Sequence, residues 1–358
     1  MSTQRQAPVT SKQQRLAAAI VRSGLLRALR GLHDRGRSPV VILAYHRIAT
    51  IERPQDYPLD LGLVSATAQE FDTQMRAVRE FANVVSLDQI ADAVTHGRTL
   101  PERAVAVTFD DGFSDTFELA FPLLRRHGIP ATVFVSTDHV ESDEPFWFEL
   151  TAHLMLRVPA RAIVFEECPV GLPAADDIAA RRAAIASVHR LLKSCPGPRR
   201  RQLVEEWRRR FAAHVDARAL ELSRPISRAQ VLQMADAGIQ FGSHTVSHPN
   251  LALTPDDAVH GELRRSREYL TQLLSRPVRS LAYPFGTPDS YDERVKSIAR
   301  ACGYELAVSF RQGVNWSGAL DALELRRIGV SPGINPEQFR AMLTLPAWLH
   351  PRLSDDDH

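Results

Sequence analysis

Short apolar runs alternate with amphipathic helical segments along most of the chain, and this alternation limits the fold more than any other feature. Strands are predicted at 40–48, 83–86, 105–109, 131–135, 239–242, 280–283, 306–308 and 325–330. Helices are predicted at 71–81, 87–94, 117–127, 227–237, 254–274, 292–301 and 336–345. Strands that are separated by helices pair in parallel, so the pattern favours a parallel α/β sheet or barrel. A length of 358 residues suits one large α/β barrel with insertions.

The strand predicted at 105–109 ends in two adjacent carboxylates, Asp110 and Asp111, followed by Gly112. Like charges held close together resist joint ionisation, so such a pair is costly at the end of a buried strand. A catalytic pair would explain the cost, with one carboxylate binding a cation and the other moving a proton. An ordinary Asp-Gly turn is the competing interpretation. This stretch by itself leaves both interpretations open.

Histidines follow two other predicted strands. His46 lies near the end of the run at 40–48, where it resembles Asp110 in its placement, and barrel active sites gather at such strand ends. His244 and His248 follow the strand at 239–242. Residues four apart share one side of a helical turn, so both imidazoles can reach one cation. Two imidazoles and one carboxylate are typical of a catalytic divalent metal, whereas two surface loop histidines are the plainer alternative.

Residues 140–225 interrupt the alternation with Ala-rich and Arg-rich helical patterning. Arg-Arg-Arg occurs at 199–201 and again at 208–210, but no aromatic stacking platform for nucleic acid accompanies these runs. The net charge of +2 gives no global reason to expect a nucleic-acid partner. We therefore predict solvated helix faces and a helical insertion that caps or rims a core domain.

The N-terminal 1–37 are predicted to be a basic helical extension, and 336–358 a helix with an acidic tail. Residues 16–32 could rest on an anionic membrane surface or pack on the domain. No transmembrane or secretory run is readable, so a cytoplasmic location is expected, with peripheral membrane contact through 16–32 as the alternative to packing on the domain. Three widely spaced cysteines without a CxxC pair argue against a disulfide framework and a thiolate zinc site.

Three motifs, taken together and in order, resemble those of a known family. They are Thr108-Phe109-Asp110-Asp111-Gly112, His244-x-x-x-His248 and Ala282-Tyr283-Pro284-Phe285-Gly286. They look like the motifs of the polysaccharide deacetylases, the NodB-homology domains of carbohydrate esterase family 4. The resemblance covers about 38–140 and 225–335, within a core domain predicted at 38–335. It implies a distorted (β/α)7 TIM-like barrel with a helical insertion, and metal-assisted removal of N-acetyl groups from amino sugars.

The resemblance also implies roles for individual residues. Asp110 matches the general base of the family and Asp111 its metal-binding carboxylate, while His244 and His248 match the histidine ligands. The third motif, Tyr283, Pro284, Phe285 and Gly286, would contact substrate, with a backbone amide near Phe285 donating to the oxyanion. The expected cofactor is a divalent metal ion, zinc first, with cobalt, nickel and manganese as alternatives.

Two departures from the family pattern matter. The family commonly has an arginine where this chain has Ala282, so the usual partner of the base is missing. Arg279 and Arg327 are candidate substitutes, although either could be an ordinary surface or sheet-edge arginine. The late Leu-x-His motif is also absent, because His350 lies in a different context. His46 matches the early-strand histidine of the branch that resembles poly-N-acetylglucosamine deacetylases, and it is the expected acid.

Three functions remain in competition at this point. The leading hypothesis is a deacetylase that acts on an N-acetylated glycan in polysaccharide or glycoconjugate synthesis. The second is an amidohydrolase of the same fold that acts on a small non-sugar amide. The third is a non-catalytic sugar-binding protein, which the complete set of site residues argues against.

Overall fold

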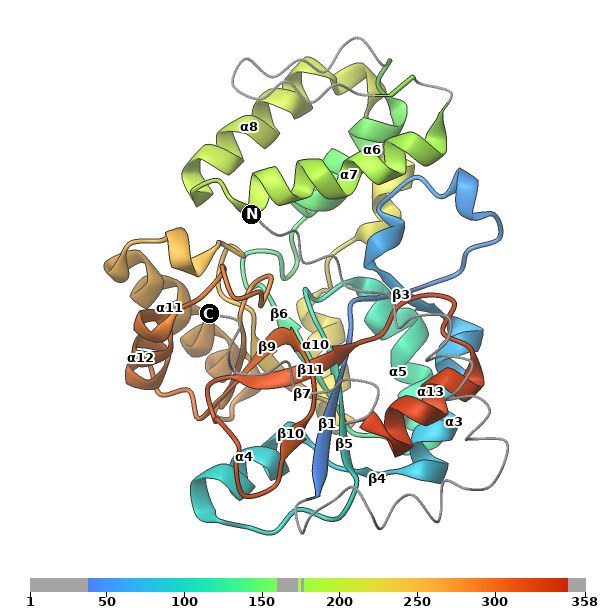
Figure 1. Cartoon of the computed structure of the whole chain (residues 1–358). Helices are drawn as coiled ribbons and strands as arrows, with labels where there is room; N and C mark the ends of the chain where they lie inside the picture. Colours follow the sequence, from blue (N-terminus) through green and yellow to red (C-terminus); the bar gives the residue numbers. More distant parts are fainter. Residues whose placement is uncertain (1–37, 160–172, 175–176, 347–358) are drawn as a thin grey trace.

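A closed barrel of parallel strands forms the centre of the molecule in the computed structural model, which describes residues 38–159, 173–174 and 177–346 (Figure 1). Strand β1 pairs in parallel with both β5 and β11, and this double pairing closes the barrel. The predicted fold class, a (β/α)7 TIM-like barrel, is confirmed. In barrel order the strands are β1 (Pro39–Tyr45), β5 (Ala104–Phe109), β6 (Ala131–Val135), β7 (Gln240–Ser243), β8 (Ser280–Ala282), β9 (Leu306–Gln312) and β11 (Leu325–Gly329).

Short strands extend the barrel at its edges. β4 (Asn83–Val84) runs parallel to β5, and β10 (Asn315–Trp316) pairs antiparallel with the start of β1. A separate two-stranded sheet joins β2 (Arg47–Ala49) to β3 (Val64–Thr67). The run at 40–48 is therefore two strands instead of the one predicted, because the chain leaves the barrel at His46 and enters the second sheet.

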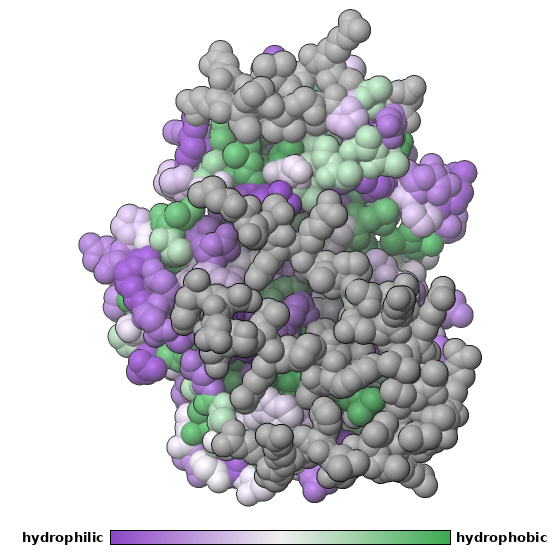
Figure 2. Space-filling model, viewed as in Figure 1, coloured by the Kyte–Doolittle hydropathy of each residue, from purple (hydrophilic) through white to green (hydrophobic). Residues whose placement is uncertain are grey.

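Amphipathic helices surround the barrel and bury one face each against it. They are α3 (Ala68–Phe81), α4 (Leu87–His96), α5 (Phe121–His127), α10 (Arg228–Asp236), α11 (Asp256–Leu274), α12 (Glu293–Ala301) and α13 (Pro336–Thr344). Their opposite faces are polar, and hydrophilic residues gather over α11 and α12 in Figure 2. The predicted helix at 117–127 differs: Thr116–Ala120 is a π-helical turn. Pro122 lacks the N–H that a regular helix needs there, which favours this irregularity.

A layer of helices lies over one end of the barrel, at the top of Figure 1. It contains α6 (Trp147–Arg157), α7 (Ile178–Lys193), α8 (Gly197–Arg210) and the short α9 (Ala217–Leu220). The layer has an apolar core of its own, which includes Leu154, Val188 and Trp207. A second apolar cluster, with Phe113, Phe146 and Phe148, joins the layer to the barrel.

Strand register aligns the ends of the strands beneath this layer. Tyr45 pairs with Phe109, and Val135 pairs with Ser243. The residues that follow these strands therefore emerge at the same end of the barrel, where parallel α/β proteins place their active sites.

No described helix is long and apolar enough to span a membrane. The basic segment predicted at 16–32, Cys168 and His350 lie outside the described residues. The predictions made for this segment and these two residues therefore stay untested.

Candidate metal centre

Asp111, His244 and His248 come together at the carboxyl ends of β5 and β7. The ligand atoms that they offer all lie within 4.8 Å of one another, and all three residues are buried. Nε2 of His244 lies 3.5 Å from Oδ1 of Asp111, and Nε2 of His248 lies 3.4 Å from the same oxygen. One carboxylate oxygen thus faces two imidazole nitrogens, an arrangement that a divalent cation could occupy.

The orientation of His244 favours this use. Its Nδ1 lies 2.8 Å from the backbone carbonyl oxygen of Ala282, which can only accept a hydrogen bond. Nδ1 therefore carries a proton, and Nε2, which faces Asp111, is the nitrogen that could bind a cation once it is deprotonated. Burial lowers the pKa of His244, but the carboxylates of Asp111 and Asp110 outweigh it and raise the pKa.

His248 stays neutral for a different reason. Burial first, and then the positive charges of His244 and Arg200, hold the pKa of His248 well below its usual value. A neutral imidazole is the form that binds metal. The residues present therefore fit a cation chemically: one carboxylate oxygen and one nitrogen from each of two imidazoles converge in a buried space.

Asp110 lies next to this centre and makes a two-pronged ion pair with Arg327 of β11. Nη1 of Arg327 donates to Oδ1 over 2.7 Å, and Nη2 donates to Oδ2 over 2.6 Å. Asp110 and Arg327 are only 2% and 1% exposed. Burial raises the pKa of Asp110, but Arg327 outweighs it and lowers the pKa to about 2. The carboxylate is thus ionised and fixed in orientation.

Arg327 is itself held by the barrel wall. Its Nε donates to the carbonyl oxygen of Ser309 over 2.7 Å, and its guanidinium lies 5.3 Å from the ring centroid of Phe310. The other candidate arginine, Arg279, lies elsewhere. It pairs with Glu305 at 2.7 Å and Asp92 at 2.9 Å, so the structure does not bring it to Asp110.

His46 emerges from β1 beside Asp110, as the register of Tyr45 with Phe109 requires. Its ring is half-buried and lies 5.4 Å from that of Phe310. Burial lowers the pKa of His46, and the carboxylates of Asp111 and Asp110 offset part of that effect. His46 is thus electrostatically coupled to both carboxylates of the centre.

The third motif forms a tight turn after β8. Gly286 accepts a hydrogen bond from the N–H of Phe310 over 2.8 Å, and a Cβ at Gly286 would lie 2.3 Å from that nitrogen. Only glycine fits this approach. The ring of Phe285 lies 4.8 Å from the ring of His248, and buried Pro284 precedes it. The turn leaves the backbone N–H of Phe285 without a hydrogen-bond partner among the described residues.

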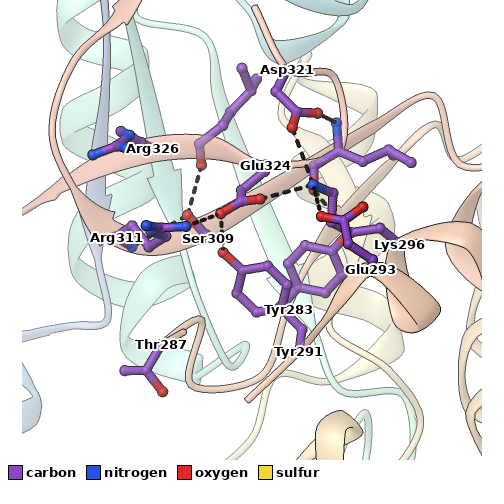
Figure 3. A network of polar contacts seen from close by, with 12 residues as sticks. Tyr283, Thr287, Tyr291, Glu293, Lys296, Ser309, Arg311, Asp321, Glu324 and Arg326 are labelled. Atoms are coloured by element: carbon purple, nitrogen blue, oxygen red, sulfur yellow. Dashed lines mark hydrogen bonds and ion pairs between the residues drawn. The ribbon is translucent and has the colours of Figure 1, made fainter. Parts of the chain in front are cut away.

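Tyr283 points away from the metal centre. Its ring stacks on Tyr291 at 4.3 Å, and its hydroxyl donates to the carbonyl oxygen of Leu323. Figure 3 shows this side of β8, where Tyr291 donates to Glu324 and Lys296 binds the same carboxylate. The structure therefore places Tyr283 in the support of the turn, apart from the cluster of Asp111, His244 and His248.

Backbone conformation sets this region apart. Asp111, His248 and Phe285 have φ angles of +73°, +54° and +64°, in the left-handed region that non-glycine residues rarely adopt. Gly112, with φ +84°, follows in the same turn, and a Cβ there would lie 2.7 Å from a methyl carbon of Val135. Such strain persists where the surroundings enforce it, and it concentrates at functional sites.

The model of the family described as "Polysaccharide deacetylase" matches residues 97–187 and 199–307, more than half of the chain. A Bacillus subtilis protein assigned as a polysaccharide deacetylase, YxkH, is 21% identical over 277 residues, which are 77% of this chain and 69% of that protein. The poly-beta-1,6-N-acetyl-D-glucosamine N-deacetylase of Staphylococcus epidermidis is 28% identical over 113 residues. That segment is 30% of this chain and only 39% of the staphylococcal protein.

Solved structures share the fold. The deacetylase PplD of Streptococcus pyogenes, in complex with acetate, superposes with a TM-score of 0.56 at 21% identity, covering 84% of this chain and 96% of that chain. IcaB from Ammonifex degensii superposes with a TM-score of 0.53 at 20% identity, covering 86% of this chain and 97% of that chain.

Proposed function

The chain belongs to the polysaccharide deacetylase family, and we propose that it removes acetyl groups from an N-acetylated amino-sugar glycan with Asp110 as base and His46 as acid. The observation that carries this proposal is the position of Asp110. This ionised carboxylate, held by Arg327, lies directly beside the cluster of Asp111, His244 and His248. A base next to a cation site is the arrangement that amide hydrolysis needs.

We assign cation binding to Asp111, His244 and His248. A divalent ion, when bound, polarises the acetamide carbonyl and acidifies water. Nitrogen and carboxylate ligands suit several ions, and zinc is our first choice, with cobalt, nickel and manganese as alternatives. The family is metal-dependent, which agrees with the presence of this cluster.

Asp110 takes the proton of the attacking water as the carbon–oxygen bond forms. The carbonyl oxygen then becomes an oxyanion, and the N–H of Phe285, which has no partner among the described residues, is our candidate donor to it. His46 supplies a proton to the nitrogen as the carbon–nitrogen bond breaks. Burial lowers the pKa of His46, and the carboxylates of Asp111 and Asp110 offset part of this effect, which favours the imidazolium that the step needs. The products are acetate and a free amino sugar.

The substrate class is proposed at two levels. An N-acetylated polysaccharide or glycoconjugate follows from the family. The finer choice, a poly-N-acetylglucosamine-like exopolysaccharide, is supported by similarity to the staphylococcal deacetylase and by the early-strand position of His46. We also propose that 140–225 is an insertion within a barrel domain at 38–335, consistent with the separate apolar core of its helices.

Acetate release from N-acetylglucosamine oligomers by the metal-loaded protein tests the proposal. Asp110→Asn removes the base but leaves Asp111, His244 and His248 in place. We expect turnover to fall at least about a hundredfold while the metal content stays near that of the wild type, since general bases contribute about 10² to 10⁴.

His244→Ala is the matched variant, because it should lose metal and turnover together. Wild-type activity in Asp110→Asn would refute the role of the base. Small N-acetylated amides, assayed in parallel, distinguish glycan hydrolysis from a general amidohydrolase.

A further inference from the structure

Three side chains of the upper helical layer reach the turn of the third motif. Trp147 opens α6, Lys193 ends α7 and Arg200 lies in α8. All three approach Phe285: the ammonium nitrogen of Lys193 lies 5.0 Å from its ring centroid, and the guanidinium carbon of Arg200 lies 5.8 Å from it. The ring of Trp147 lies 6.4 Å from the same ring. The helical layer thus contributes side chains to the edge of the metal centre.

Arg200 is an unusual residue in this position. It is only 3% exposed, and its guanidinium lies 4.9 Å from the ring centroid of Trp147. Nη2 donates to the carbonyl oxygen of His248 over 2.8 Å. Nη1 is buried and has no hydrogen-bond partner in the part of the chain that the structure describes. Burial, and then the charge of Arg201, lower the pKa of Arg200 to about 10, as expected for a cation without a counterion.

Further donors in the same place lack acceptors. Nε1 of Trp147 is buried and unpartnered among the described residues. Lys193 and Arg200 make no ion pair with any described carboxylate within 4.0 Å. Lys193 is exposed, so the cost of burying a cation without a counterion falls on Arg200, and each unsatisfied buried donor in a native protein calls for an explanation. An anionic ligand would explain two buried donors without acceptors in the described part of the chain, on Arg200 and Trp147, next to the ammonium of Lys193 at the same Phe285 ring.

We propose that Trp147, Lys193 and Arg200 form a subsite for an anionic group of the glycan, either a carboxylate or a phosphoryl group. The inference rests on the proposed function and narrows its substrate class. Contact of the subsite with Phe285 and His248 places the anion on the sugar that carries the reacting N-acetyl group or on its neighbour. Arg200 and Lys193 donate charge-assisted hydrogen bonds to it, and the indole N–H adds a neutral one.

Matched oligosaccharides test the subsite. One is a neutral N-acetylglucosamine oligomer, one alternates N-acetylglucosamine with a uronic acid, and one carries a phosphodiester beside the N-acetyl sugar. The ratio of kcat/KM on each anionic oligomer to kcat/KM on the neutral one is the readout. We expect the full-length, metal-loaded protein to prefer one anionic oligomer at least about tenfold, and the preferred oligomer distinguishes carboxylate from phosphoryl recognition.

Lys193→Gln should reduce this ratio about tenfold, as loss of one charged donor predicts. Arg200→Lys keeps the positive charge but loses the forked guanidinium. It should therefore reduce the ratio by a smaller factor than Arg200→Gln does. Arg209→Gln is the control, because Arg209 is an exposed arginine of the same helix that pairs with Glu205, and its loss should leave the ratio unchanged. An equal ratio in Lys193→Gln, Arg200→Gln and the wild type overturns the subsite.

Binding measurements separate this proposal from the proposed function. Titration of each oligomer into the Asp110→Asn protein at two salt concentrations needs no turnover. Two results support the subsite even if no oligomer is hydrolysed. Adding Lys193→Gln should weaken binding of the anionic oligomer, and high salt should weaken its binding to the Asp110→Asn protein that keeps Lys193. Hydrolysis of the neutral oligomer without any charge preference supports the deacetylase and refutes the subsite.

Discussion

At the residue scale, the partner of Asp110 is the point that the sequence left open. Arg279 and Arg327 were equal candidates, because both lie near the predicted strands and neither occupies the motif position held by Ala282. Of these two arginines, the structure brings only Arg327 to Asp110. Arg327 lies on β11 and Asp110 follows β5, and these two strands flank β1. We propose that Arg327 performs the orienting role that the family arginine has elsewhere. Strand pairing between β1 and both β5 and β11 makes this substitution geometrically feasible.

Arg327→Gln should therefore shift the pH dependence of catalysis. Burial alone raises the pKa of Asp110, and Arg327 is the cation that lowers it to about 2. Without Arg327 the pKa rises, so the acidic limb of the kcat/KM profile moves to higher pH, and kcat falls by about 10² because the base is no longer oriented. The pH profile of acetate release measures both effects.

Arg279→Gln is the control, since Arg279 pairs with Glu305 and Asp92 and makes no ion pair with Asp110. An unchanged acidic limb in Arg327→Gln would contradict the proposed role. The same limb should be unchanged in Arg279→Gln.

At the scale of elements, helix α8 shows how a charge run misleads. The arginines at 199–201 were predicted to be solvated, yet Arg200 is buried. Arg200, Leu203 and Trp207 are spaced three, four and seven residues apart, which places them on one helix face. That spacing, together with Phe146-Trp147-Phe148 upstream, was the signal available in the sequence. The burial itself depends on helices that are distant in the chain.

A buried ion-pair network joins the barrel side to the helical layer. Nε of Arg47, at the start of β2, lies 2.8 Å from Asp115, and its Nη1 lies 2.6 Å from Glu149 of α6. Arg47 also donates to the hydroxyl of Tyr57 over 2.9 Å. All of these side chains are buried, so removal of Arg47 leaves two buried carboxylates without their cation.

Arg47→Met should lower the free energy of unfolding by about 3 to 5 kcal/mol, measured by urea denaturation, because breaking a buried pair strands its partners. Arg208→Met removes a cation from an exposed pair with Glu144 and should cost less than about 1 kcal/mol. Equal losses in the two variants would mean that the Arg47 network does not anchor the layer.

At the scale of the whole molecule, the candidate metal centre joins the carboxyl ends of β5 and β7. The helices of the upper layer lie between these two strands in the sequence. A ligand that binds only the folded state stabilises it by mass action. Chelation should therefore lower the melting temperature and abolish acetate release, and zinc should restore both. The affinity should weaken as pH falls, because protonation of His244, whose pKa is raised, competes with the metal.

Asp111→Asn and His244→Ala should remove the difference in melting temperature between chelated and zinc-loaded protein. Differential scanning calorimetry with and without zinc measures this. A chelator effect that persists in both variants would place the stabilising ion elsewhere.

The sequence by itself determined the barrel and the members of the candidate metal cluster. Alternating strands and helices impose parallel pairing, and polar residues that follow such strands must meet at one end. Local spacing therefore predicted that Asp110, Asp111, His244 and His248 come together. Only the tertiary structure decided which arginine meets Asp110, that Tyr283 faces away and that Arg200 is buried above Phe285. These outcomes depend on closure of the barrel and on packing between segments that are distant in the chain. The local periodicity of apolar residues encodes neither.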